Sequence, residues 1–169
     1  MHSRTMILGV LAALAAAPAM ARDACLVGRW TPEGNGAAEW VQRQAPGMKM
    51  LVTQQVATLR LGADGDYSLQ SQVRAEAANA GVTARSDGAF TARGSWRSAG
   101  NQLTLAPAAS TTDGKVELGA GNGRSTGFAL PKSGVQTTVH EYVCTGDVLE
   151  TRMRIPGVAD PIVQRYRRQ

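Results

Sequence analysis

After residue 21, apolar or small residues alternate with polar ones along most of the chain. In DYSLQSQVRAE, residues 66–76, one face carries Tyr, Leu, Ser, Val and Ala, and the other carries Ser, Gln, Arg and Glu. The segments 89–97 and 149–155 repeat this pattern. A period of two is typical of a half-buried β-strand. Because the second face is polar, the pattern predicts an all-β, antiparallel sheet with one solvated face.

Short pairs containing glycine separate the alternating segments. Such pairs favour tight hairpins because they tolerate positive φ angles. Strands joined by successive hairpins form an up-and-down meander, which must close or stack to protect its edges. We therefore expect a barrel, with turns or irregularities at Asp64-Gly65, Asp87-Gly88, Gly100-Asn101, Asp113-Gly114 and Gly146-Asp147. Since Asp87-Gly88 directly precedes an alternating stretch, a bulge is the alternative to a turn at that pair.

Two hairpin segments align without gaps. WRSAGNQLTL (96–105) and YVCTGDVLET (142–151) each have an aromatic residue, then a glycine four positions later, then Asn or Asp, then Leu. This spacing predicts two strand–turn–strand units whose aromatic residue and leucine share a face. Duplication and convergent hairpin sequences both explain the similarity.

Other segments depart from the period of two. In residues 36–47, apolar positions at helical spacing end at Pro46-Gly47, which predicts a short helix after the first strand, capped by Asn35 or Gly36. The glycine-rich stretch 118–127 lacks the sequence of a phosphate-binding loop, and we expect a flexible loop there. Periodicity is weak from Ala106 to Gly134, so the sequence leaves the strand count open.

The first 21 residues have the composition of a signal peptide. Arg4 precedes an apolar stretch, and Ala19-Met20-Ala21 forms a cleavage motif. We expect residues 22–169 to form a single domain that is periplasmic or secreted. In an exported chain, the two cysteines, Cys25 and Cys144, indicate a disulfide, and two free buried thiols are the alternative.

Charge and chemistry exclude several functions. The net charge is +5, but the basic residues are scattered except for Arg165, Arg167 and Arg168, and no basic patch with interleaved aromatics indicates a nucleic-acid partner. His140 is the one histidine after residue 21, and we expect it to be a structural or surface residue. No metal-ligand spacing and no nucleophile motif occurs, so we expect no metal, no cofactor and no enzymatic activity. Arg, Glu and Gln on the alternate faces argue against a membrane-spanning barrel.

The sequence resembles the small exported bacterial lipocalin-like proteins of the calycin type. The resemblance rests on Gly28-Arg29-Trp30 within CLVGRW, the D-G-x-Y hairpin at residues 64–67, and the two hairpins at 94–105 and 142–149. It implies a lipocalin-like barrel in which Trp30 packs at the closed end beneath a basic residue from the last strand. The basic residue expected there is Arg165 or Arg167, with barrel closure as the shared role.

The same resemblance implies a small apolar or amphipathic ligand inside the barrel. Many inward positions are small, which favours a cavity, whereas a barrel of about eight strands can also be filled by its own side chains. The alternative is an envelope protein-interaction or inhibitor module with a filled barrel, whose contact surface would be the segment 106–134. The expected ligand-binding residues are Leu59, Leu61, Tyr67, Leu69, Phe90 and Leu103.

Overall fold

The computed structural model describes residues 22–79, 81–120, 123–132 and 134–169. The expected signal peptide, residues 1–21, lies outside the described residues. The described part of the chain contains one helix, α1 (Gly36–Gln44), which follows the first strand as expected. The strands are β1 (Gly28–Glu33), β2 (Lys49–Leu61), β3 (Asp66–Asn79), β4 (Val82–Ala99), β5 (Gln102–Ala120), β6 (Ser125–Ala129), β7 (Thr138–Thr145), β8 (Val148–Met153) and β9 (Ile162–Arg168).

Eight of these strands form a closed antiparallel barrel, which confirms the predicted fold class. Around the ring the order is β1, β2, β3, β4, β5, β7, β8 and β9, and β9 pairs with β1. The strand β6 lies outside this ring and pairs with the far end of β5, from Lys115 to Gly119. Every ring neighbour is also a sequence neighbour except at the β5–β7 and β9–β1 contacts, so the barrel is an up-and-down meander.

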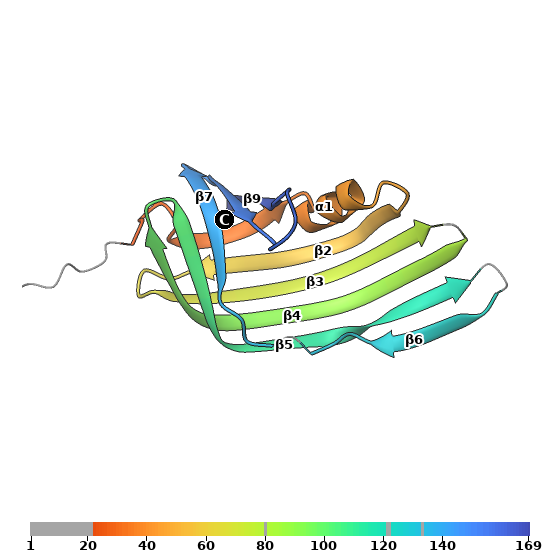
Figure 1. The fold of residues 1–169 in the computed structure, drawn as a ribbon. Helices are drawn as coiled ribbons and strands as arrows, with labels where there is room; N and C mark the ends of the chain where they lie inside the picture. Colours follow the sequence, from red (N-terminus) through yellow and green to blue (C-terminus); the bar gives the residue numbers. More distant parts are fainter. Residues whose placement is uncertain (1–21, 80, 121–122, 133) are drawn as a thin grey trace, which may run out of the picture.

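The ring of strands is closed only at one end of the long strands β2 to β5. The strand β1 pairs with β2 only at 59–61, and β7 pairs with β5 only at 102–105. In Figure 1, β2 to β5 run the length of the molecule, while β7 and β9 stay at one end. The remaining halves of β2 to β5, with β6, therefore form an open five-stranded sheet that continues the barrel wall. We call this part the extension.

The helix α1 lies against β9 and β2. Asn35 caps it, since its side-chain oxygen accepts a hydrogen bond of 3.0 Å from the Ala38 N–H. At Gly36 the helix begins so close to β9 that an added Cβ would lie 1.8 Å from the Val163 carbonyl oxygen. The Trp40 indole donates to the Asp160 carbonyl oxygen at 2.8 Å. Among the described residues no helix has the length and apolar character needed to cross a membrane.

Three of the five expected turn positions are turns, and two are not. The hairpins at Asp64-Gly65, Gly100-Asn101 and Gly146-Asp147 form, each with its glycine at positive φ. The pairs Asp87-Gly88 and Asp113-Gly114 instead lie inside β4 and β5, opposite each other. Asp87-Gly88 is not a bulge either, because the irregularity in this strand pair falls between Arg93 and Gly94.

The prediction of a flexible loop at 118–127 is also largely wrong. Strand β5 continues to Ala120 and β6 begins at Ser125, so most of the stretch pairs in a sheet. Residues 121 and 122 lie outside the described part.

The two misassigned glycines have a packing role. Gly88 and Gly114 are directly opposite, and an added Cβ on either would lie 2.8 or 2.9 Å from the Leu130 side chain. The Leu130 N–H continues the β5–β6 ladder by donating to the Gly114 carbonyl oxygen at 2.9 Å. The glycine pair therefore makes the space in which the chain that leaves β6 packs on the sheet.

We expect Gly114→Ala to destabilise the protein by about 1 to 3 kcal/mol. Its φ of +150° disfavours a side chain, and a Cβ would lie 2.3 Å from the Asp87 carbonyl oxygen. Urea unfolding checks this. The matched control is Gly134→Ala, where a Cβ meets nothing within 4 Å, and a change within about 0.5 kcal/mol is expected. Equal stability of the two variants would contradict this account.

Candidate functional site

The buried core fills the closed end of the barrel. Both hairpins that align in the sequence contribute their aromatic residue and their leucine to it, as their spacing predicts. Leu26, Trp30 and Leu149 are fully buried. Among the described residues, the buried apolar ones are Leu26, Trp30, Leu59, Leu61, Tyr67, Ala92, Trp96, Leu103, Leu105, Tyr142 and Leu149.

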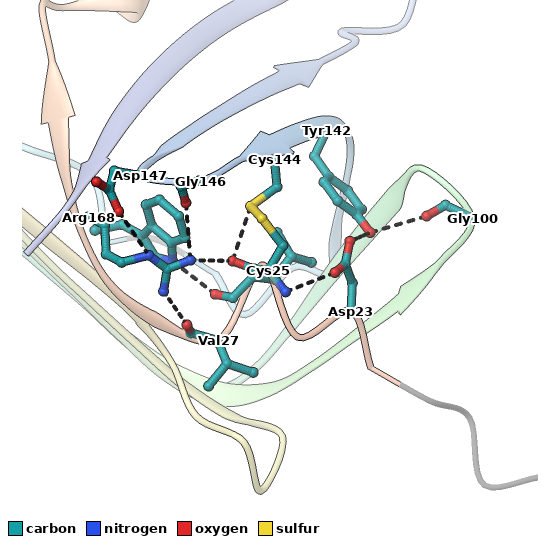
Figure 2. Close-up of a disulfide and its surroundings, with 11 residues drawn as sticks. Asp23, Cys25, Val27, Gly100, Tyr142, Cys144, Gly146, Asp147 and Arg168 are labelled. Carbon is teal, nitrogen blue, oxygen red and sulfur yellow. Dashed lines mark hydrogen bonds and ion pairs between the residues drawn. A yellow bond between two sulfur atoms is a disulfide. The ribbon is translucent and has the colours of Figure 1, made fainter.

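Residues 22–27 lie across this end of the barrel, and we call them the cap segment. Figure 2 shows the cap segment tied to the β7–β8 hairpin by a disulfide between Cys25 and Cys144. Their Cα atoms are 6.1 Å apart, and the residues are 119 positions apart in sequence. The predicted disulfide is confirmed, and free thiols are excluded for these two cysteines.

The two similar hairpins hold the cap segment at corresponding positions. Cys144 stands two residues after Tyr142, as Ser98 stands two residues after Trp96. The Ser98 hydroxyl accepts a hydrogen bond of 2.9 Å from the Asp23 N–H. One hairpin thus binds the cap segment covalently and the other through a hydrogen bond.

The Arg168 side chain supplies two of the donors that bind the cap segment. The Arg168 guanidinium donates to the Val27 carbonyl oxygen at 2.6 Å and to that of Cys25 at 2.7 Å (Figure 2). The Trp30 indole N–H donates to the Leu26 carbonyl oxygen between them, at 2.9 Å. The guanidinium carbon lies 4.3 Å from the centre of the Trp30 ring, which adds a cation–π contact.

This geometry explains the glycine of the Gly-x-Trp triplet. A Cβ at Gly28 would lie 2.5 Å from the Arg168 Nη1 atom. Any side chain at this position would therefore displace the guanidinium from the carbonyl groups that it binds.

The sequence-based choice of Arg165 or Arg167 as the partner of Trp30 was wrong. Alternation along β9 points Arg168 and Tyr166 inward and points Arg165 and Arg167 outward, where both pair with Glu33. The error is one of register, since a shift of one residue moves a side chain to the other face.

Three tyrosines have raised pKa values. Burial, together with the hydrogen bond to the Asp23 carboxylate at 2.8 Å, raises the pKa of Tyr142 to about 12. Burial raises the pKa of Tyr166 to about 12 as well, and it also raises that of Tyr67. Deprotonation would place a phenolate in a buried surrounding at Tyr67 and Tyr166, and beside the Asp23 carboxylate at Tyr142.

The six expected ligand-binding residues lie together, but most of them are packed into the core. Leu59, Leu61, Tyr67 and Leu103 are between 1% and 4% exposed. Leu69 and Phe90 are partly buried and pack against that core from the side of the extension. The structure therefore places only these two at the boundary between the filled end and the extension.

The inner face of the extension is uncharged, mostly apolar and only half-buried, with Gln55, Ser71, Thr112 and Thr126 as polar members. Strand register aligns this face with the core, and we call it the open inner face. Every charged residue of β2 to β6 belongs to the opposite face. Val82, Leu118 and Phe128, at its far end, are 49%, 39% and 48% exposed. The face includes Val52, Ala57, Val73, Ala75, Ala77, Ala84, Ser86, Phe90, Val116, Leu118 and Phe128.

The six ligand-binding residues expected from the sequence are mostly large apolar ones, so they leave out most of this face. The series of small residues at alternate positions, Ser, Val, Ala and Ala in 71–77 and Ala, Ser and Gly in 84–88, indicated a cavity but was not assigned to the site. Those residues are too small to fill the space between the walls of a barrel.

His140 adds a further titratable group to the interior. His140 points inward, opposite Leu103, and burial lowers its pKa. Its Nε2 atom lies 2.9 Å from the Thr138 hydroxyl. Within the described residues no group of three or more His, Cys, Asp or Glu side chains is placed to hold a metal ion.

In comparisons with known proteins, no family model, no curated protein and no solved structure matches this chain. The class is therefore defined by the structure alone. It is a closed, eight-stranded antiparallel β-barrel with a filled end, a disulfide-bound cap segment and an open apolar extension.

We expect Arg168→Met to lower the free energy of unfolding by about 2 to 4 kcal/mol, because hydrogen bonds from a charged donor and the cation–π contact are lost together. Urea unfolding of the oxidised protein measures this. Arg167→Met is the matched control. It removes an exposed ion pair, and a loss below about 1 kcal/mol is expected. Similar losses in both variants would show that Arg168 has no special role.

Alkaline titration tests the burial of the tyrosines. In the folded protein Tyr142 and Tyr166 keep their protons up to a pH of about 12, whereas unfolded tyrosines lose theirs at about 10. The free energy of unfolding is therefore expected to be unaffected below about pH 10 and to fall between about pH 10 and 12. Tyrosinate absorbance and circular dichroism, recorded together, check this. A full tyrosinate signal near pH 10 with the fold intact would contradict it.

Proposed function

We propose that this is an exported, lipocalin-like protein that binds a small apolar or amphipathic molecule, and that it is a binding protein rather than an enzyme. The ligand would lie on the open inner face, with Leu69 and Phe90 at the inner end of its site. The buried core residues would support the site from below without contacting the ligand.

The observation that carries this proposal is the open inner face itself. A sheet with charges on one face and apolar residues on the other normally buries the apolar face. Here the apolar face continues from the core but remains half-exposed as far as Phe128. Exposed contiguous apolar surface of this kind marks a site of interaction.

Two further observations support the lipocalin-like and exported parts of the proposal. The Gly28-x-Trp30 triplet lies at the closed end beneath a basic residue of the last barrel strand, which is the arrangement that the resemblance implies. The disulfide supports a location outside the reducing cytosol, since disulfides persist in oxidising compartments.

One observation favours the alternative of a protein-interaction module. Leu118 and Phe128, both exposed, lie in the segment 106–134, which would be its contact surface. Under this alternative a partner protein, and not a small molecule, would cover the open inner face.

Native mass spectrometry of the protein isolated from its own cells distinguishes the small-molecule-binding protein from the protein-interaction module. A reproducible additional mass that is lost on unfolding supports a small-molecule ligand and reports its size. A bare chain that co-purifies with a stoichiometric protein partner supports the interaction module instead.

Substitutions locate the ligand. We expect the neutral apolar probe phenylnaphthylamine to bind with enhanced fluorescence, and Val116→Ser on the open inner face to weaken binding about threefold to tenfold. Val56→Ser is the matched control on the opposite face, where Val56 is 59% exposed, and it should leave the affinity unchanged. Equal effects of the two variants would place the probe elsewhere.

A further inference from the structure

Three arginines form a row across the outer face of the barrel. Arg29 of β1 is directly opposite Arg60 of β2. Arg60 is opposite Ser68 of β3, and Ser68 is opposite Arg93 of β4. All three arginines are exposed. We call Arg29, Arg60 and Arg93 the arginine row.

No acidic side chain in the described part of the chain forms an ion pair with the arginine row. Three cations of the extension, on the same outer face, are paired: Arg74 with Asp87 at 2.7 Å, Arg85 with Glu76 at 3.2 Å, and Lys115 with Glu117 at 2.8 Å. Lys49, at the far end of β2, forms no ion pair with a described residue. Charge on the outer face is thus largely neutralised along the extension and left uncompensated at the closed end.

The arginine row borders a hollow of about 550 Å³ on the outer face. Arg60 and Arg93 line it, and several other lining side chains are small, including Ser95, Ala106 and Ala108. Asp66 is the one carboxylate among its lining residues. Small neighbours leave both guanidinium groups free to approach a partner from outside.

The spacing of the arginine row indicates an extended anionic partner. Like charges directly opposite on paired strands destabilise a sheet, so the Arg29–Arg60 pair carries a cost that an anion between the two would relieve. From Arg29 to Arg93 the row spans three strand spacings, about 14 Å. A single small oxyanion cannot contact all three guanidinium groups, whereas a surface that carries many phosphate groups can.

We propose that the arginine row docks the protein on an anionic phospholipid surface. This inference rests on the proposed function, because a protein that binds an apolar molecule must collect or release it where such molecules dissolve, in a lipid phase. Among extended anions, that requirement favours a phospholipid surface. The bilayer would face the outer side of β1 to β4 at the closed end, and the open inner face would remain accessible.

Co-sedimentation with vesicles tests the proposal. The full mature protein is mixed with vesicles of phosphatidylcholine alone or of phosphatidylcholine and phosphatidylglycerol in equal parts. We expect binding only to the anionic vesicles, and a loss of binding as salt is raised. We expect the double variant Arg60→Gln/Arg93→Gln to bind about 30-fold more weakly, since each basic residue near such a surface contributes about 1 kcal/mol.

The matched control is Arg74→Gln/Arg85→Gln. It removes the same formal charge from the same outer face, but its positions lie about 20 Å from the arginine row, beyond the screening length of about 10 Å at moderate salt. We expect it to bind within about threefold of the unmodified protein. Circular dichroism of each variant verifies that the fold is retained.

The following outcomes would overturn the proposal. Binding that is equal on neutral and anionic vesicles, or an equal loss in the two double variants, shows that the arginine row is not the docking surface. Binding to single-stranded DNA, with none to the anionic vesicles, assigns the row to a different polyanion. Phenylnaphthylamine binding without vesicles tests the proposed function separately, so failure of one is distinguishable from failure of the other.

Discussion

The closed end of the barrel depends on the hydrogen bonds that the Arg168 guanidinium donates to the cap segment. A chain that crosses the end of a barrel without being part of a strand leaves its carbonyl groups without ladder partners. Buried carbonyls without donors are costly, and the oxygens of Cys25, Leu26 and Val27 all receive one, from Arg168 or from Trp30. Gly28 is required for this contact because a side chain there would occupy the same space. The Gly-x-Trp triplet is thus one half of an interaction whose other half is an arginine of β9.

Local patterns predicted the elements that depend on local physics. The alternation in 66–76, the cap at Asn35 and the turns at Gly100 and Gly146 all follow from backbone preferences within a few residues. Asp113-Gly114 misled the same reasoning because its glycine serves a distant contact with Leu130 rather than a turn. The arginine above Trp30 was misassigned because strand register depends on pairing with β1 and β8, which no single segment contains.

The candidate site was predicted less well than the fold, for a related reason. The sequence identifies Leu59, Leu61, Tyr67 and Leu103 as inward, but inward residues of a narrow ring fill it with their own side chains. Whether an inward residue contacts a neighbour or a ligand depends on how far the ring pairing extends. The closed ring ends where the pairing of β1 with β2 at 59–61 and of β7 with β5 at 102–105 ends. Beyond these short paired segments, the small residues of β3 and β4 are left uncovered.

The pairing of β1 with β9 also has a consequence for the order of folding. Synthesis proceeds from the N-terminus, so β1 and the cap segment exist long before the strand and the arginine that complete them. The contacts of Arg168 with the cap segment join residues 141 and 143 positions apart. Contacts of such separation form late and slowly, because the entropy of closing a long loop must be overcome first. Trp30 and Leu26 therefore remain exposed to solvent, or to a chaperone, until β9 has been made and has paired with β1.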